Sequence, residues 1–318
     1  MALTGFLALA ATAAAAQVPG GGGDAPRPPA SSSTPAATPV FSTPLDKRPV
    51  AIVVQAPYRF DDLIWENDRT VHRIYGRALE GAEPPSGSGI DSWGKNVVWP
   101  FADRHLRTGD QHRYNGEGLD FYHVGTTRGA GGLGIWWDNK LWTSRNYVRP
   151  RILHTGGDLA DFTVDYDPWP VGTDRTVRET RRFTLRTGTH FTRLQSTIAS
   201  NRPGDLLVGI GIGRRTTGPG AGALTVDRAA GIISWWGPEE GENGRMAVAL
   251  KVDPSAIAEI RQDADNELVL LRVTPGRPFV YYTGSAWSLG QGGFHDRAGW
   301  DRYVSAERTD FMPWAPPK

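Results

Sequence analysis

The fold class follows from two consecutive segments, Thr180-Arg181-Arg182-Phe183-Thr184-Leu185 and Thr189-His190-Phe191-Thr192-Arg193-Leu194-Gln195-Ser196-Thr197-Ile198. In both segments apolar residues alternate with polar ones or run together, which is typical of strands. A short linker with Gly188 joins them, and the turn Asn201-Arg202-Pro203-Gly204 separates them from a third apolar run, Leu206–Ile212. Strands so closely spaced by turns predict an antiparallel sheet.

The same pattern continues on both sides of these segments. Further strands are expected at residues 50–54, 71–79, 232–236, 246–252, 268–273 and 279–283. A helical pattern occurs only at Pro254–Glu259 and at Asp296–Glu307, where Trp300, Tyr303 and Val304 share one face. The sequence therefore predicts an all-β fold, an antiparallel sandwich or barrel with few short helices.

Glycine and tryptophan add two expectations. Gly129-Ala130-Gly131-Gly132-Leu133-Gly134 precedes Ile135-Trp136-Trp137 and no helix, so we expect a strand passing close to another backbone, not a phosphate loop. Adjacent strand residues face opposite sides. At least one member of each pair Trp136-Trp137 and Trp235-Trp236 should therefore line a groove or a second packed layer.

Composition divides the chain into three parts. Residues 1–16 are apolar and end in Ala13-Ala14-Ala15-Ala16, which resembles a secretory signal peptide. Residues 17–49 are rich in Gly, Pro, Ser, Thr and Ala, as in a disordered linker. Residues 50–318 then form a single β-sandwich domain. We expect an exported protein, periplasmic or secreted.

Charge and cysteine content exclude several classes of function. The 318 residues carry 35 basic and 34 acidic side chains, a formal net charge of +1 without a basic stripe. Nucleic acid and anionic membranes are therefore not expected partners. There is no cysteine, which excludes thiol catalysis and disulfides. Beyond residues 1–16 no apolar run approaches the length of a membrane span.

Two polar, aromatic stretches are the candidates for a site: Trp65-Glu66-Asn67-Asp68-Arg69, and the segment from Gln111 to Asp120. Indole and phenol rings stack on sugar faces, while carboxylates and guanidinium groups meet hydroxyls or a uronate carboxylate. The alternative is structural, with turns and core positions accounting for the same residues. Expected substrate-binding residues are Trp65, Asp68, Arg69, Arg73, Asp91, Trp93, Arg113 and Asp120.

Two reactions suit these residues. In a lyase, His112 or Tyr114 removes the C5 proton of a uronate while Arg113 or Arg73 neutralises its carboxylate. In a hydrolase, Glu117 forms a carboxylate pair with Glu66 or Asp120. The expected catalytic residues are therefore His112, Tyr114, Glu117 and Glu66. No cofactor and no metal site are expected, although a calcium ion held by carboxylates and carbonyls is compatible with this composition.

Several motifs together resemble one family, domain of unknown function 4861, whose members are secreted bacterial proteins with folds like galactose mutarotase. The motifs are Trp65-Glu66-Asn67-Asp68, Val71-His72-Arg73-Ile74-Tyr75-Gly76, Gly89-Ile90-Asp91-Ser92-Trp93 and Gly116-Glu117-Gly118-Leu119-Asp120-Phe121-Tyr122-His123-Val124-Gly125. The genes of such proteins often neighbour those of enzymes that degrade uronate-containing polysaccharides. The resemblance implies a β supersandwich with a sugar-binding cleft, and it supplies no catalytic residues.

The leading prediction is an exported enzyme that acts on uronate-containing oligosaccharides by lyase or glycoside hydrolase chemistry. Its partner is an oligosaccharide or polysaccharide. A non-catalytic carbohydrate-binding protein would use the same aromatic and arginine residues. An aldose epimerase or mutarotase-like enzyme follows from the fold analogy alone.

Overall fold

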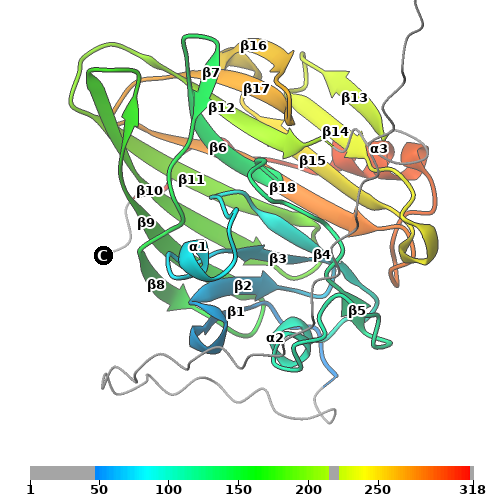
Figure 1. Cartoon of the computed structure of the whole chain (residues 1–318). Coiled ribbons are helices and arrows are strands. Elements are labelled where there is room, and N and C mark those ends of the chain that lie inside the picture. The colour runs from blue at the N-terminus through cyan, green and yellow to red at the C-terminus, as the bar shows by residue number, and fades with distance from the viewer. Residues whose placement is uncertain (1–46, 215–221, 316–318) are drawn as a thin grey trace, which may run out of the picture. The chain divides into compact units, whose positions relative to one another are not determined.

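The computed structural model describes residues 47–214 and 222–315, and these belong to one compact unit. They form an all-β fold in which every pairing between strands is antiparallel (Figure 1). The predicted signal peptide and most of the predicted linker lie outside the described residues.

An eight-stranded sheet forms the base of the fold. Its strands, in spatial order, are β13 (Ala223–Asp227), β14 (Ile232–Trp236), β15 (Met246–Val252), β18 (Pro278–Trp287), β11 (Phe191–Ser200), β10 (Arg175–Arg186), β9 (Leu159–Val171) and β8 (Arg149–His154). The two segments that indicated the fold class pair with each other here, Phe183 opposite Leu194. Both side chains are buried in the main hydrophobic core.

Two five-stranded sheets pack against this base. The first follows sequence order: β1 (Ile52–Ala56), β2 (Asp62–Glu66), β3 (Val71–Ile74), β4 (Asp91–Lys95) and β5 (Gly118–Leu119). The second has the order β16 (Ile257–Gln262), β17 (Asn266–Val273), β12 (Leu206–Gly213), β6 (Ala130–Trp137) and β7 (Lys140–Trp142). An isolated parallel bridge between Ile90 and Gly129 connects them, and one core cluster contains residues of all three sheets. The molecule is thus an antiparallel β-sandwich.

Buried hydrogen bonds attach the first sheet to the base. The Trp65 indole donates to the Thr192 hydroxyl of β11 at 2.9 Å. The Ser92 hydroxyl of β4 contacts the Ser285 hydroxyl of β18 at 2.6 Å. Because strand residues alternate in direction, the neighbours of Trp65 and Ser92 point to the opposite, outer face of the sheet.

Helices are few and short, as predicted: α1 (Leu79–Ala82), α2 (Ala102–Leu106) and α3 (Arg297–Ala306), with 3-10 turns η1 (Pro57–Arg59), η2 (Gly241–Asn243) and η3 (Pro254–Ala256). α3 matches the predicted helix, and its N-cap Asp296 accepts a hydrogen bond from Gly299 N. Trp300 and Val304 pack on the outer face of the base sheet. The helix predicted at Pro254–Glu259 is wrong, because only η3 forms before β16 begins and pairs with β17.

The remaining fold predictions also have clear outcomes. The strand predicted at 71–79 ends at Ile74, because the chain then turns into α1. Gly76 lies close to the chain at Phe60, where a Cβ would be 2.3 Å from the Phe60 carbonyl oxygen. The glycine-rich strand is confirmed: a Cβ on Gly129 would lie 2.1 Å from the Ile90 carbonyl oxygen. Trp137 is 52% exposed beside buried Trp136. Trp235 and Trp236 are both buried, one in the main core and one beneath α3.

Candidate functional site

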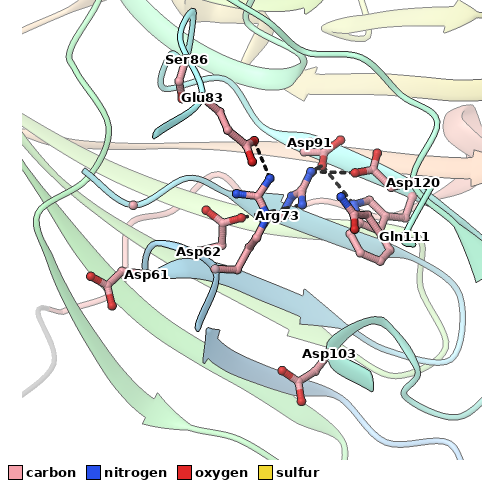
Figure 2. Close-up of polar contacts among 12 residues, drawn as sticks. Asp61, Asp62, Arg73, Glu83, Ser86, Asp91, Asp103, Gln111 and Asp120 are labelled. Carbon is pink, nitrogen blue, oxygen red and sulfur yellow. Dashed lines mark hydrogen bonds and ion pairs between the residues drawn. The ribbon is translucent and has the colours of Figure 1, made fainter. Parts of the chain in front are cut away.

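A buried arginine organises the outer face of the first five-stranded sheet. Cross-strand register places Arg73 of β3 opposite Asp91 of β4, and Asp62 of β2 lies on the same face. Arg73 Nε and Nη2 donate to Asp91 Oδ2 at 2.9 and 2.7 Å, and Nη2 also donates to Asp120 Oδ2 at 2.7 Å. Figure 2 shows Arg73 between Asp62 and the pair Asp91 and Asp120. One cation thus faces three carboxyl groups.

The three carboxyl groups have shifted proton affinities. Burial raises the pKa of Asp62 to about 7, partly offset by Arg73 and Arg59. Burial and the neighbouring Asp120 raise the pKa of Asp91 to about 7, and burial also raises the pKa of Asp120. Since Asp91 and Asp120 both bind Arg73 Nη2 at 2.7 Å, their Oδ2 atoms are at most about twice that distance apart. Such a group of carboxyls with raised pKa values beside a cavity is typical of a functional site.

A cavity of about 320 Å³ opens beside this cluster. Arg73 and Asp120 contribute to its wall, and its other titratable lining residues are Arg59, Tyr75, Glu83, His112, Tyr122 and His123. The size suits a small ligand such as one or two sugar rings.

His112 is an exposed base of this cavity, with 61% of its side chain exposed. Its Nδ1 lies 2.9 Å from the Asp120 carbonyl oxygen, which can only accept, and 3.8 Å from Asp120 Oδ2. Nδ1 therefore carries the proton. The Gln111 amide lies 3.1 Å from Nε2, which suits an amide donor to a ring lone pair. His112 is thus oriented with its ring lone pair on Nε2, which accepts from the Gln111 amide.

Arg59 supplies a second cation. Its Nη2 binds Glu83 Oε2 at 2.6 Å, and within the described residues its Nη1 has no hydrogen-bond partner. Phe60 and Asp61 follow with left-handed φ angles of 55° and 64°. This conformation is uncommon outside glycine and is found at functional sites. It turns the chain between Arg59 and Asp62.

Several predicted site residues are instead held inside the protein. Trp65 and Trp93 are buried, Trp65 among core aromatic rings and Trp93 against Phe101. Glu66 Oε2 pairs with Lys95 Nζ at 2.7 Å, and its Oε1 accepts from the backbone N–H groups of residues 101 and 102, where α2 begins. These contacts use both Glu66 oxygens in support of α2.

Asp68 and Arg69 lie apart from the Arg73 cluster. Asp68 Oδ1 accepts from Gly188 N at 2.7 Å, and its Oδ2 lies 3.2 Å from Arg69 Nε. Neither lines the cavity beside His112. Asp68 connects the segment after β2 to the turn between β10 and β11.

Glu117, Arg113 and Tyr114 lie on the loop between α2 and β5. Arg104 Nη2 donates to both Glu117 carboxylate oxygens at 2.8 Å, and the Trp99 indole donates to Oε1 at 2.6 Å. Arg113 and Tyr114 line a different cavity, of about 360 Å³. The structure therefore brings together Arg73, Asp91, Asp120 and His112. It leaves Glu66 and Glu117 in ion pairs of their own.

Sequence reasoning missed Arg59 and Asp62 as members of the site. Asp62 had a readable signal, because Asp62, Ile64 and Glu66 share one strand face that includes two carboxylates. Arg59 had none, since its position depends on the left-handed turn that follows it. In the described part of the chain, no group of three or more His, Asp or Glu side chains has metal-site geometry. No described helix is long and apolar enough to cross a bilayer.

Comparison with known proteins identifies the family. The model of the domain of unknown function (DUF4861) matches residues 30–312. The chain belongs to this family. Besides the DUF4861 match, it is 30% identical over 264 residues to "Uncharacterized protein P7" of Formosa agariphila, covering 78% of this chain. The chain spans 64% of the length of that relative.

Solved structures with some similarity to this DUF4861 protein include two galactosidases. The galactosidase domain of alpha-galactosidase-sucrose kinase AgaSK has a TM-score of 0.35 and 8% identity, over 74% of this chain and 42% of that one. The GH36 alpha-galactosidase AgaB from Geobacillus stearothermophilus has a TM-score of 0.32 and 11% identity, over 74% and 41%. Similarity at this level carries no argument about the reaction.

Proposed function

We propose that this protein is a carbohydrate-active enzyme that cleaves uronate-containing oligosaccharides by β-elimination in the cavity beside His112. The observation that carries the proposal is the position of an exposed, oriented imidazole and two arginines around one cavity. A lyase needs a base for the C5 proton and a cation for the neighbouring carboxylate. The sequence suggested His112 or Tyr114 as the base and Arg113 or Arg73 as the cation. Of these four residues, His112 and Arg73 line this cavity.

Arg59 is the better carboxylate ligand of the two arginines. Arg73 is buried and already contacts Asp91 and Asp120, so little of its positive charge is available to a substrate. Arg59 is held by Glu83, whose side chain is about half exposed. The Arg59 side chain itself is mostly buried, with 16% exposed. A uronate carboxylate entering the cavity would therefore compete with Glu83 for Arg59.

The proposed reaction is balanced within the cavity. Once substrate displaces the Gln111 amide, His112 Nε2 takes the C5 proton, the C5 electron pair forms the C4–C5 double bond, and the C4–O bond breaks. The leaving oxygen receives a proton from Tyr122 or His123, which line the same cavity. Arg59 stabilises the charge that develops on the carboxylate as the proton leaves.

Hydrolysis is a second candidate, favoured by the raised pKa of Asp120. A carboxyl whose pKa is raised by burial can act as the general acid of a glycosidase. Glu66 and Glu117 are less suited to that role, because both are engaged in ion pairs.

The test uses pectic, alginate, ulvan and glucuronan oligosaccharides and follows ultraviolet absorbance of unsaturated uronate together with new reducing ends. We expect absorbance to rise, and His112→Ala to lower the rate about 10²–10⁴-fold. His154→Ala is the matched control, since His154 is an exposed histidine at the end of β8. Reducing ends without absorbance would indicate hydrolysis. Binding without turnover would leave a carbohydrate-binding protein, and rapid equilibration of free aldose anomers would indicate a mutarotase.

We also propose that the protein is exported, on the basis of residues 1–16. The full chain should then be recovered outside the cytoplasm of a bacterial host and begin near Gln17. A chain that stays in the cytoplasm with its N-terminus intact would contradict export.

A further inference from the structure

A second cavity lies on the other side of the loop that bears His112. Its volume is about 360 Å³, and it is lined by His105, Thr108, Asp110, Arg113, Tyr114 and Asn115. His112 and Arg113 are consecutive residues, with Cα atoms about 3.8 Å apart, yet they line different cavities. The loop that bears these two residues therefore borders both cavities.

The loop between the cavities is held in place along its length. The Asp120 N–H donates to the Gln111 carbonyl at 2.8 Å, and His105 Nε2 lies 2.9 Å from the Arg113 carbonyl. Asn115 Oδ1 accepts from two backbone N–H groups at 2.9 and 3.2 Å. Glu117, bound to Arg104, anchors the C-terminal end. A ligand in the second cavity therefore meets a preformed surface.

Tyr114 gives this cavity an oriented aromatic ring. Its side chain is 46% exposed, and its ring packs 5.7 Å from that of Trp287. Its hydroxyl accepts from Asn96 Nδ2 at 2.8 Å and donates to the Gly116 carbonyl at 3.1 Å. A partly exposed aromatic ring whose hydroxyl is held by hydrogen bonds suits stacking against a sugar.

Arg113 gives the same cavity an available cation. Its side chain is 82% exposed, and within the described residues its ion pair is with Asp110, also exposed, at 3.9 Å. A pair this long and solvated adds little stability. The guanidinium can therefore turn to a ligand carboxylate, which it can bind through two parallel hydrogen bonds.

We propose that the cavity beside Tyr114 is a second sugar-binding position, which takes the next acidic residue of a uronate oligosaccharide whose cleaved bond lies in the His112 cavity. Tyr114 stacks on the sugar face, and Arg113 binds its carboxylate. The substrate is therefore an acidic oligomer or polymer long enough to occupy both sides of the loop. This inference rests on the proposed function for the assignment of the first cavity.

The test measures affinity against chain length by calorimetry, with oligogalacturonates and oligoglucuronates of two to six residues. The parent for binding is His112→Ala, so that substrate is not consumed. Adding Tyr114→Ala or Arg113→Gln should weaken binding of the longer oligomers about tenfold and that of dimers less than about twofold. Tyr114→Phe, which keeps the ring, should retain most of the affinity.

Trp137→Ala and Arg149→Gln are the matched controls, because both residues are exposed and line neither cavity. Circular dichroism checks that each variant is folded. Equal losses of affinity at every oligomer length, or no loss at any length, would overturn the second sugar-binding position. Failure of the His112→Ala parent to bind oligogalacturonates or oligoglucuronates would overturn it as well. If His112→Ala keeps full turnover, the reaction assignment fails while the length dependence still tests the cavity.

Discussion

The variant Glu66→Gln tests whether the Glu66 carboxylate is structural or catalytic. The substitution keeps the shape of the side chain and removes its negative charge, so Lys95 Nζ loses its ion pair at 2.7 Å. A glutamine oxygen can still accept from the two N–H groups at the start of α2. Breaking a buried ion pair costs about 3–5 kcal/mol. Burial already lowers the pKa of Lys95, so the amine can lose its proton when Glu66 no longer carries a charge. We therefore expect the free energy of unfolding to fall by about 3 kcal/mol, the lower end of this range.

Thermal unfolding by circular dichroism measures this cost. For a domain of this size about 1 kcal/mol corresponds to about 2–4 °C, so Tm should fall by roughly 6–12 °C. Glu239→Gln makes the same change in an exposed ion pair, with Arg245 at 3.1 Å, and should cost less than about 1 kcal/mol. Turnover well below Tm should persist in Glu66→Gln. An unchanged Tm combined with lost activity would refute the reasoning and make Glu66 a reacting group.

Two further predictions concern stability. The Asp62 pKa rises from 3.8 to about 7 on folding, so between these values the folded state holds a proton that the unfolded chain releases, and stability falls as pH rises through this range. Urea titrations at pH 4 and pH 8 measure the free energy of unfolding. Between these pH values it should fall by about 3–4 kcal/mol less in Asp62→Asn than in the unsubstituted protein. An unchanged pH dependence would contradict this. Gly129→Ala places a Cβ 2.1 Å from the Ile90 carbonyl at a φ of +55° and should cost more than about 3 kcal/mol, whereas Gly109→Ala, with a φ of +73° and open space, should cost about 1 kcal/mol. Equal urea midpoints for the two variants would show that the close approach carries no strain.

Alternation in the sequence predicted individual strands well where one face is buried. Phe183, Leu185 and Leu194 all lie in the main core, as their pattern indicates. The alternating pattern does not determine the order of the strands in the sheet. β18 lies between β11 and β15 because it pairs with residues that are distant in sequence. The same long-range pairing explains the wrong helix after Pro254, since β17 draws the following residues into a strand.

Four of the six residues of the candidate site were named from residue type alone, and Arg59 and Asp62 were not. The dense titratable stretch did contain His112 and Asp120, and Arg73 and Asp91 belong to the motifs singled out in the sequence. Residue type could not separate them from Glu66, whose carboxylate turns inward to Lys95 and α2. Whether a side chain on this sheet face lines the cavity or is covered depends on which segment packs over it. The local sequence around each residue does not show this.

The attachment of the first sheet to the base has a consequence for protein synthesis. The residues around the His112 cavity all lie between Arg59 and Gly125 and leave the ribosome early. Their sheet rests on Thr192 and Ser285, which emerge much later. A nascent chain stopped before β11 therefore contains every residue of the cavity and lacks both strands, β11 and β18, to which that sheet is attached.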